Sequence, residues 1–217
     1  MIRLLIVRHG RTSWNEAGRF IGQMDPPLDA AGRAQAEALA ELLKGVPFEA
    51  AFTSDLRRAE ETAEIILRGR SLSPFSDPRL REASFGEWEG LAYTEIAARD
   101  RERLKRWEAD PRQTPPPGGE SLNDLAARLR TLLAELLGDH EEQNILLVTH
   151  GGPARVLLCL ALGVPLEKHW KFNLANGGLA EVEFHGGEGI LVELRNPGGL
   201  RPQGRGPNPR PGELSKP

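Results

Sequence analysis

Two short stretches, one near the start of the chain and one in its last third, end in the same pair of residues, a histidine followed by a glycine. In the first, the apolar run 4–7 leads into Arg8-His9-Gly10, and in the second, the run 145–148 leads into Thr149-His150-Gly151. Imidazole can act as a nucleophile or carry a proton near neutral pH, and guanidinium binds anions. These residue types in these two places predict a pocket that receives an anionic substrate.

The apolar runs before the two histidines are the elements that would position them. Continuous apolar runs of this length, bounded by glycine, are typical of strands buried on both faces of a sheet. In a doubly wound sheet, ligands bind just beyond the carboxyl ends of such strands. We therefore expect His9 and His150 to converge on one pocket.

A third segment, residues 53–63, passes from a predicted strand into a helix and carries Arg57 and Arg58. Together the three segments offer guanidinium groups, imidazoles and the N–H groups of helix starts, which are the groups that bind a phosphate dianion. The two arginines also have an ordinary structural explanation, since they could pair with Glu60 and Glu61 for roughly a few tenths of a kcal/mol. We favour the phosphate site because all three segments follow strands and can face one rim.

A metal site is the competing explanation for the histidines. We discount it because no second histidine or carboxylate stands at metal-ligand spacing beside His9 or His150. The sequence therefore predicts no metal and no other cofactor.

Strands and helices alternate along the chain. Strands are predicted at 2–7, 50–53 and 144–149, with a closing hairpin at 179–184 and 189–194; helices are predicted at 29–45, 56–67, in a charged region ending near 107, at 121–136 and at 152–162. Asp29 and Ser121 are the expected N-caps, the latter paired with Asp124. The buried sides of the first and fourth helices are expected to comprise Ala36, Leu39, Ala40, Leu42 and Leu43, and Leu122, Leu125, Leu129, Leu132, Leu133 and Leu136. This alternation predicts an α/β fold, a three-layer sandwich with a mostly parallel central sheet flanked by helices.

Composition limits the class of protein. With 217 residues, 39% hydrophobic and 27% charged, the chain suits one soluble domain with a real core. The net charge of −3 disfavours a nucleic-acid binder. Cys159 is the only cysteine, which excludes an internal disulfide and fits a reducing compartment. No run approaches the roughly 18 apolar residues of a membrane span, and no signal peptide is evident, so we expect a cytoplasmic protein.

The last part of the chain has a different composition. Residues 195–217 contain six prolines and five glycines among 23 positions, and such a segment buries too little apolar surface to offset its ordering entropy. We therefore divide the chain into a domain of residues 1–194 and a Pro/Gly-rich C-terminal tail of residues 195–217. A solvated extension is favoured over an anion-binding or partner-binding tail.

The motifs resemble those of the histidine phosphatase superfamily, in its phosphoglycerate-mutase-like branch. The hallmark of that family is Arg-His-Gly after the first strand, here residues 8–10. Its Ser-x-Leu-x-Arg-Ala-x-x-Thr-Ala motif matches residues 54–63, its Leu-x-Glu-x-x-x-Gly motif matches 80–86, and its second His-Gly matches 150–151. The resemblance covers roughly residues 2–194 and implies the fold of that family.

The resemblance also implies roles for individual residues. His9 is the implied nucleophile, which forms a phosphohistidine, and Glu82 is the implied proton donor. Arg58, rather than Arg57, is the implied phosphate-binding arginine because it precedes the alanine of the motif. The implied phosphate contacts are completed by Arg8, Thr12, Asn15, Gly22, His150 and the Gly151 N–H.

The implied chemistry is physically coherent. An unperturbed imidazole has a pKa of about 6.5, and neighbouring Arg8 and Arg58 disfavour a second positive charge on His9. The other ring nitrogen of His9 needs an acceptor, for which we expect a local backbone carbonyl. Glu82 must be protonated to protonate the leaving oxygen, and it then acts as base for the water that attacks the phosphohistidine.

The same apparatus serves phosphatases and mutases. Where the cofactor-dependent glycolytic mutases have Glu-Arg-x-Tyr and Phe-Thr-Gly, residues 82–85 read Glu-Ala-Ser-Phe and residues 20–22 read Phe-Ile-Gly. Only 29 residues separate Gly90 from Glu120, and residues 117–121 resemble the phosphatase branch. We therefore predict a metal-independent phosphomonoester hydrolase that acts through a phosphohistidine on small phosphorylated metabolites.

Two alternatives stay open. One is a cofactor-dependent phosphoglycerate mutase that holds the glycerate by other contacts. The other is a non-catalytic phosphate-binding protein, which the joint presence of His9, Arg58, Glu82 and His150 disfavours.

The substrate and the partners are less defined. Candidates include sugar phosphates, phosphoglycerates, nucleotides and α-ribazole phosphate. Phe20, Ile21, Phe85 and Trp88 either give the entrance an apolar character or belong to the core, and Arg11 either aids a second anionic group or lies in solvent. We expect a small-molecule phosphate ester as the partner, and neither nucleic acid nor a membrane. The oligomeric state stays open between a monomer and a homodimer paired through the edge strand near 189–194.

Overall fold

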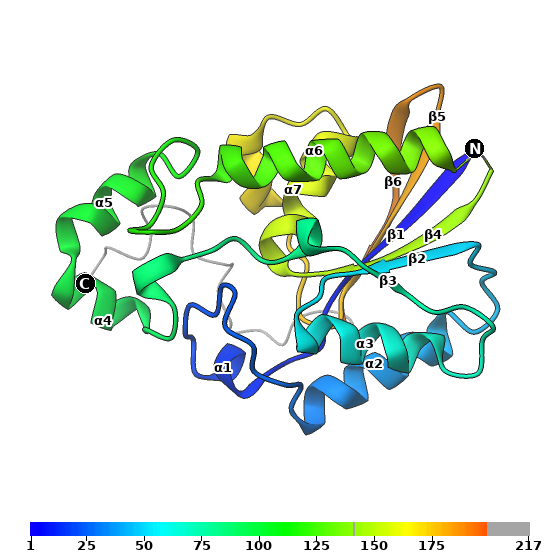
Figure 1. The fold of residues 1–217 in the computed structure, drawn as a ribbon, viewed down its shortest axis with the longest axis horizontal. Helices are drawn as coiled ribbons and strands as arrows, with labels where there is room; N and C mark the ends of the chain where they lie inside the picture. Colours follow the sequence, from blue (N-terminus) through cyan, green and yellow to red (C-terminus); the bar gives the residue numbers. More distant parts are fainter. Residues whose placement is uncertain (141, 199–217) are drawn as a thin grey trace.

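The computed structural model describes residues 1–140 and 142–198, and its centre is a six-stranded sheet in the order β3-β2-β4-β1-β5-β6 (Figure 1). The strands are β1 Ile2–Arg8, β2 Ala50–Thr53, β3 Phe75–Ser76, β4 Asn144–Thr149, β5 Leu179–His185 and β6 Glu188–Arg195. β3, β2, β4 and β1 run parallel, whereas β5 is antiparallel to β1 and β6 to β5. The predicted mostly parallel sheet is confirmed.

Helices cover both faces of the sheet, as the predicted sandwich requires (Figure 1). α2 Ala30–Leu42 and α3 Arg57–Leu67 lie on one face, and α6 Leu122–Asp139 and α7 Gly151–Ala161 on the other. The shorter helical elements are α1 Ser13–Glu16, η1 Pro78–Leu80, η2 Gly86–Trp88, α4 Tyr93–Arg99, α5 Arg101–Ala109 and η3 Leu166–Lys171.

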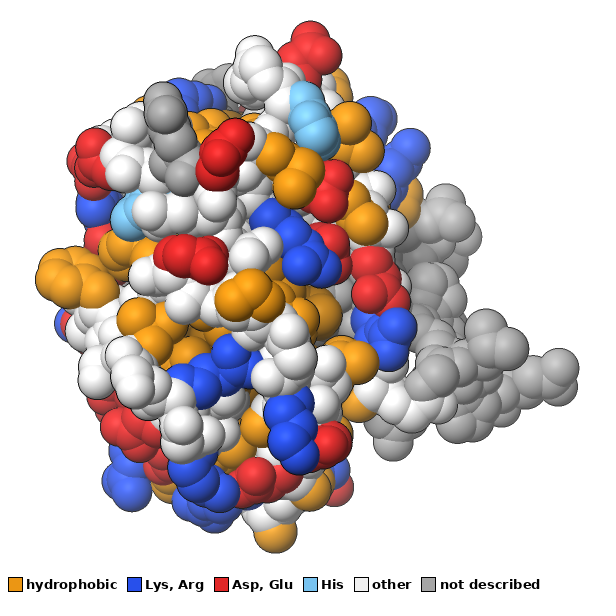
Figure 2. Space-filling view, turned by 90° about the vertical axis from the view of Figure 1, so that its right-hand side faces the viewer, with side chains coloured by type: hydrophobic (Ala, Val, Ile, Leu, Met, Phe, Trp, Pro, Cys, Tyr) orange, Lys and Arg blue, Asp and Glu red, His pale blue; other side chains and the backbone are white. Residues whose placement is uncertain are grey.

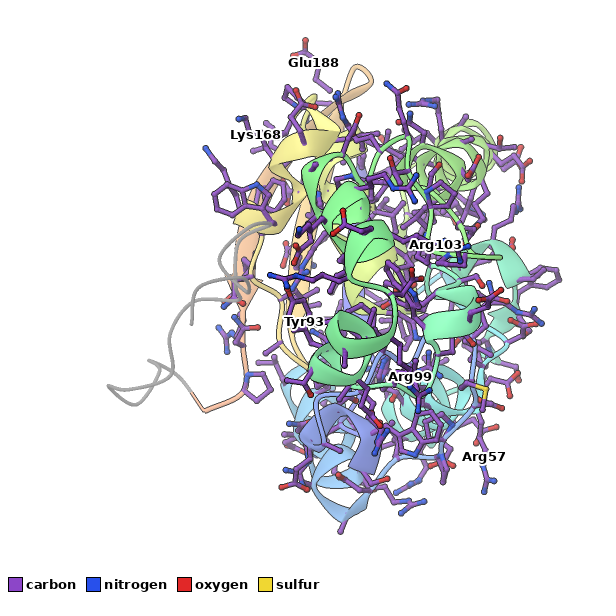
Figure 3. The ribbon with its side chains drawn as sticks, turned by 90° about the vertical axis from the view of Figure 1, so that its left-hand side faces the viewer. Arg57, Tyr93, Arg99, Arg103, Lys168 and Glu188 are labelled. Atoms are coloured by element: carbon purple, nitrogen blue, oxygen red, sulfur yellow. The ribbon has the colours of Figure 1, made fainter. Side chains whose placement is uncertain are left out.

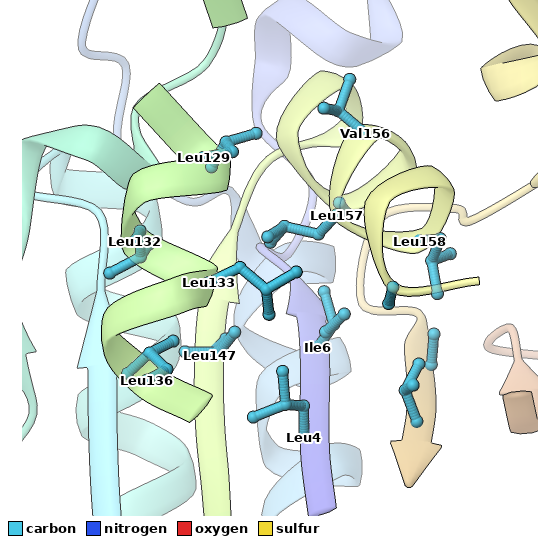
Figure 4. Close-up of a cluster of buried hydrophobic side chains, with 14 of the residues drawn as sticks. Leu4, Ile6, Leu129, Leu132, Leu133, Leu136, Leu147, Val156, Leu157 and Leu158 are labelled. Atoms are coloured by element: carbon cyan, nitrogen blue, oxygen red, sulfur yellow. The ribbon is translucent and has the colours of Figure 1, made fainter. Parts of the chain in front are cut away.

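The core follows from the side-chain alternation of β1. Leu4 and Ile6 face the leucines of α6 and α7 (Figure 4). Leu5 and Val7 pack with α2 and α3, because successive strand residues point to opposite faces. Each fully buried leucine stabilises the fold by about 1.5–3 kcal/mol. The strand is thereby anchored in both layers, which holds its carboxyl end in place.

The predicted caps are present. Asp29 accepts a hydrogen bond from the Gly32 N–H at 2.7 Å, and Ser121 and Asp124 form a reciprocal capping box. One expectation about a helix face is wrong. Leu42 is 42% exposed, because Leu39 and Leu43, one turn apart, occupy the buried line and Leu42 lies beside it.

The predicted charged helical region before residue 107 is present as two helices. α4 and α5 meet at Asp100, whose φ of −142° and ψ of 43° are not helical. The Asp100 carboxylate accepts a hydrogen bond from Trp88 Nε1 at 3.2 Å. This hydrogen bond links the break between the two helices to the buried side chain of Trp88.

Aromatic side chains fill the space beneath α4 and α5. Trp88 is buried with Ile96 and Leu104, and Phe20, Phe85 and Trp107 pack around them. Figure 3 shows α4 and α5, which carry Tyr93, Arg99 and Arg103, in front of the sheet on its carboxyl-end side. Trp88 and Ile21 therefore belong to the core.

The closing hairpin is present with a tighter turn than the predicted 185–189 loop. Gly186 and Gly187 connect β5 and β6 with φ of 61° and 90°, a conformation that favours glycine at both positions. Ile190 and Val192 on the edge strand β6 are 54% and 50% exposed.

The face at the amino ends of the parallel strands carries charges of both signs. Figure 2 shows the face at the amino ends of the parallel strands, where acidic and basic side chains are interspersed with small hydrophobic groups. Within the part of the chain that the structure describes, none of the helices combines the length and apolarity needed to cross a bilayer.

Candidate active site

Strand register brings the two histidines together. β1 and β4 are adjacent and parallel, and Arg8 pairs with Thr149 as their last residues. His9 and His150 therefore leave the sheet side by side, with ring centroids 4.9 Å apart at an interplanar angle of 62°. The predicted convergence of the two histidine-glycine motifs is confirmed.

Arg58, in the first turn of α3, lies between the two imidazoles. Its Nε donates to His9 Nε2 at 3.2 Å and to His150 Nδ1 at 3.1 Å. Its terminal nitrogens donate to the carbonyls of Met24 at 2.7 Å and Gly22 at 2.8 Å. The side chain is 1% exposed, and these carbonyls fix its orientation. Arg57 instead pairs with Glu61 on the helix surface at 3.0 Å.

The hydrogen bonds define which His9 nitrogen carries a lone pair. Nδ1 lies 2.6 Å from the Gly10 carbonyl, which can only accept, so Nδ1 carries the hydrogen and Nε2 the lone pair. Burial, with Arg58 and then Arg8 adding repulsion, lowers the pKa of His9 well below 6.5. The ring is therefore neutral at pH 7, with Nε2 directed at Arg58. The expected backbone acceptor is confirmed.

His150 has a different support. Its Nε2 lies 2.8 Å from Ser54 Oγ, and a hydroxyl can donate or accept. Burial is the main cause that lowers the pKa of His150 well below 6.5, followed by the charge of Arg58. The neutral ring accepts from Arg58 at Nδ1 and donates from Nε2 to Ser54.

Arg8 supplies a further cation. Its Nη1 donates to the Leu174 carbonyl at 2.9 Å, while its Nε is buried and has no hydrogen-bond partner among the described residues. Burial first, and then the charge of Arg155, lowers the pKa of Arg8 to about 10. The guanidinium thus stays charged at pH 7 and has one donor directed at no protein acceptor.

Glu82 follows η1, and its carboxylate contacts the N-terminus of α7. Both of its carboxylate oxygens are 3.2 Å from the Gly152 N–H, and Oε1 also accepts from the Ala83 N–H at 2.9 Å. A Cβ at Gly152 would overlap Glu82 Oε1, and a Cβ at Gly151 would come 3.1 Å from Arg8 Cζ. The two glycines therefore make room for the arginine and the carboxylate that flank them.

Thr12, Asn15 and Gly22 shape the loops around this cluster. Thr12 caps α1, and its N–H and Oγ1 both donate to Asn15 Oδ1 at 3.0 Å. Asn176 Nδ2 donates to the His9 carbonyl and to Asn15 Oδ1, both at 3.3 Å. Gly22 contributes its carbonyl to Arg58. All three lie beside the cluster.

Arg11 lies outside the cluster. Its guanidinium pairs with Asp29 at 2.8 Å and with Glu16 at 3.1 Å. These pairs satisfy its charge, so it has a structural explanation.

A cleft of about 360 Å³ extends from Arg8 and Glu82 toward α5 and η3. Its walls are the aromatic rings of Phe85 and Trp107, the residues 151–152, and the further lining residues Ala83, Pro111, Glu120, Leu122, Leu125, Arg155 and His169. Phe85 therefore gives the entrance the apolar character considered above, whereas Trp88 does not.

Three residues of the site and its cleft were not predicted from the sequence. Ser54 stood in a recognised motif but had no role there, Asn176 carried no signal, and Arg155 could have been found because it follows Gly151 by one helical turn. Within residues 1–140 and 142–198, no three His, Cys, Asp or Glu side chains are grouped so that they could hold a metal ion.

Comparison with known proteins decides the family. The profile of the histidine phosphatase superfamily (branch 1) matches residues 4–197. The chain belongs to the histidine phosphatase superfamily. Phosphoserine phosphatase 1 of Hydrogenobacter thermophilus is 31% identical over 89% of this chain and 92% of the relative.

Solved structures of histidine phosphatases also match. The α-ribazole phosphatase of Shigella flexneri superposes with a TM-score of 0.84 at 32% identity, covering 88% of this chain and 95% of the other. A mycobacterial glucosyl-3-phosphoglycerate phosphatase gives 0.80 at 35% identity, covering 87% and 96%. The chain is thus a phosphatase-type histidine phosphatase, and its reaction class is phosphomonoester hydrolysis.

Proposed function

We propose that this histidine phosphatase hydrolyses small-molecule phosphate esters through a phosphohistidine formed on His9. The observation that carries the proposal is the position of Arg58 Nε between the lone pairs of His9 and His150. The unpartnered Nε–H of Arg8 lies in the same cluster. Two buried cations thus meet beside two imidazoles, and a bound anion would neutralise their charge.

In the first step, His9 Nε2 attacks phosphorus and the bond between phosphorus and the ester oxygen breaks. Protonated Glu82 gives its proton to that oxygen, and the leaving alcohol departs. Arg8, Arg58 and His150 offset the charge of the transferring phosphoryl oxygens, which is the main catalytic resource in phosphoryl transfer.

In the second step, water attacks the phosphorus of the phosphohistidine. Glu82 takes a proton from that water, the bond between nitrogen and phosphorus breaks, and inorganic phosphate leaves. His9 Nε2 regains its lone pair, while the Gly10 carbonyl holds the Nδ1 hydrogen throughout.

We assign substrate binding to Arg8, Thr12, Asn15, Gly22, Arg58, His150 and Gly151. Their contacts support this assignment in two ways. Arg8 and Arg58 bring donor groups to the cluster, and His150 brings an imidazole nitrogen that accepts from Arg58. Thr12, Asn15 and Gly22 belong to the loops that border it, and Gly151 begins α7 beside Arg8.

The wider organisation is part of the same proposal. Residues 1–194 would form the catalytic domain and 195–217 a Pro/Gly-rich tail, of which residues 199–217 lie outside the described residues. We also propose a cytoplasmic location and a homodimer through β6, on which Ile190 and Val192 are exposed. Dimerisation is tested by the mass in solution of the chain and of Val192→Lys.

Phosphorus NMR tests the reaction. The protein is incubated in EDTA with p-nitrophenyl phosphate, and separately with 3-phosphoglycerate and a trace of 2,3-bisphosphoglycerate. The proposal predicts inorganic phosphate without 2-phosphoglycerate. Rapid appearance of 2-phosphoglycerate would make the chain a mutase, and no turnover without added metal would remove metal independence.

Glu82→Gln tests the proton donor. Because p-nitrophenolate leaves readily without a proton, the variant should slow hydrolysis of alkyl phosphates by about 10²-fold or more and of p-nitrophenyl phosphate much less. Steady-state kinetics on both substrates measures this difference. Equal losses on the two would contradict the assignment of Glu82 as acid.

A further inference from the structure

Arg155 is a cation in the cleft that the proposed reaction does not use. It lies on α7, four residues after Gly151, and lines the same cleft as Arg8 and Glu82. Four residues of helix correspond to about 6 Å along its axis. Arg155 thus starts about one helical turn beyond the glycine pair 151–152, and its charge acts on Arg8 in the cleft that both arginines line.

Arg155 has no ion-pair partner among the residues that the structure describes, although the charge of Glu82 acts on it from beyond ion-pair distance. Its Nε is buried without a hydrogen-bond partner, and no ion pair to it occurs within residues 1–140 and 142–198. Other partly buried arginines differ in this respect: Arg79 pairs with Asp77 at 2.7 Å, and Arg128 pairs with Glu120 at 2.8 Å. A desolvated guanidinium without a carboxylate is costly. Arg155 shares this property with Arg8 of the phosphate cluster, and a bound anion would explain both.

The surroundings of Arg155 define the chemistry of that ligand. Glu120, the other carboxylate of the cleft besides Glu82, is already bound by Arg128. His169 Nδ1 lies 2.9 Å from the Leu166 carbonyl, and burial lowers the pKa of His169. Its ring is therefore neutral, with Nε2 as an acceptor in the cleft wall. One unpaired planar cation beside a neutral acceptor matches a single carboxylate better than a second phosphate dianion.

We infer that Arg155 binds a carboxylate on the leaving group, so that the preferred substrates are phosphate monoesters of hydroxy acids or hydroxy amino acids. The inference rests on the proposed phosphatase function. In this arrangement Arg8, Arg58 and His150 hold the phosphoryl group and Arg155 holds the acid at the other end. His169 Nε2 is placed to accept from a hydroxyl or ammonium group of the same substrate.

Matched substrate pairs test the inference. Phosphoethanolamine is phosphoserine without its carboxylate, and glycerol 3-phosphate replaces the carboxylate of 3-phosphoglycerate by a hydroxymethyl group. We expect kcat/KM to be about 10- to 100-fold higher for the acid in each pair, as for loss of one charge-assisted bidentate contact. Arg155→Gln should bring this ratio close to one, mainly by raising KM for the acids.

Arg112→Gln is the matched control. Arg112 lies near the same end of α5 but outside the cleft lining, paired with Asp110 at 3.2 Å and Glu167 at 3.5 Å. Its removal should leave the ratio between acid and matched substrate unchanged. Arg155→Lys, which keeps the charge without the planar fork, should retain part of the preference.

The possible outcomes distinguish failure of the carboxylate assignment from failure of the proposed phosphatase function. Equal kcat/KM within the pairs in the unmodified protein, or equal losses on all four substrates in Arg155→Gln, would overturn the carboxylate assignment while p-nitrophenyl phosphate is still hydrolysed. Absence of hydrolysis of every substrate, p-nitrophenyl phosphate included, would overturn the proposed function itself. The preference of the unmodified protein is measurable even if Arg155→Gln does not fold.

Discussion

The two histidine-glycine strand ends occupy adjacent places in the sheet, but different atoms hold their imidazole rings. His9 Nδ1 is bound to the Gly10 carbonyl of its own loop at 2.6 Å, whereas His150 Nε2 is bound to the Ser54 hydroxyl at 2.8 Å. A carbonyl accepts only, while a hydroxyl accepts or donates. The tautomer of the first ring is therefore set by an acceptor of its own loop, whereas that of the second is set by the Arg58 N–H at Nδ1, and the Ser54 hydroxyl adapts to it.

This difference separates the proposed roles. A nucleophile needs a lone pair directed at phosphorus in every turnover, which the Gly10 carbonyl secures at His9 Nε2. A group that offsets phosphoryl charge must present a hydrogen, and His150 can gain one at Nδ1 because a dianion favours the protonated ring. Arg58 contacts both rings in the same manner, so the arginine alone does not distinguish them.

The pair His9→Asn and His150→Asn should show the largest effect. His9→Asn removes the only proposed nucleophile and should lower kcat by at least about 10³-fold. His150→Asn removes one charge-stabilising group and should lower kcat by about 10²–10³-fold, yet it should still form the phosphoenzyme. Steady-state turnover and burst kinetics with p-nitrophenyl phosphate measure both.

The opposite result for the two variants would contradict the proposed roles of the two histidines. A burst of p-nitrophenol retained in His9→Asn and lost in His150→Asn would make His150 the nucleophile. His185→Asn, at an exposed strand end far along the hairpin, is the control and should behave as the unmodified protein.

Ser54→Ala sharpens the comparison with a smaller effect. The substitution removes the hydroxyl that contacts His150 Nε2 and leaves the Gly10 carbonyl of His9 in place. We expect kcat/KM to fall by about 3- to 10-fold, the value of one ordinary hydrogen bond. Since Ser54 Oγ also accepts from the Leu56 N–H at 3.2 Å, thermal unfolding must accompany the kinetics. A loss as large as that of His9→Asn would show that the support of His150 is as critical as the nucleophile.

The smallest expected effect is on the free energy of unfolding. The two histidines should affect its pH dependence in the same way. Burial, with Arg58 next, lowers the pKa of both well below 6.5 in the folded protein, whereas the unfolded chain titrates near 6.5. Below about pH 6.5 the unfolded state therefore binds protons that the folded state does not, and the free energy of unfolding falls as pH falls, by up to about 1.4 kcal/mol per pH unit for each histidine.

Urea unfolding at pH 7.5 and 5.5 measures this dependence. His9→Asn and His150→Asn should each lose about 1 kcal/mol less than the unmodified protein on acidification, and His185→Asn should lose the same amount. If all four proteins lose equal stability, burial of the two imidazoles is not the cause.

Part of this arrangement was predictable because it depends on local sequence. Buried strands are continuous apolar runs, and motif residues such as His9, Arg58 and His150 follow strand ends by fixed spacing. The break between α4 and α5 at Asp100 was not predictable, since it involves a contact with Trp88 Nε1. The isolation of Arg155 was not predictable either, because lack of a partner is a property of the packed molecule.

The most direct test of the account is to locate the phosphoryl group on the protein. The chain is mixed with p-nitrophenyl phosphate, quenched in alkali, in which phosphohistidine survives, and digested for peptide mass mapping. The account predicts a phosphoryl group on His9 and none on His150. Phosphorylation of His150, or hydrolysis without any phosphoprotein, would contradict it.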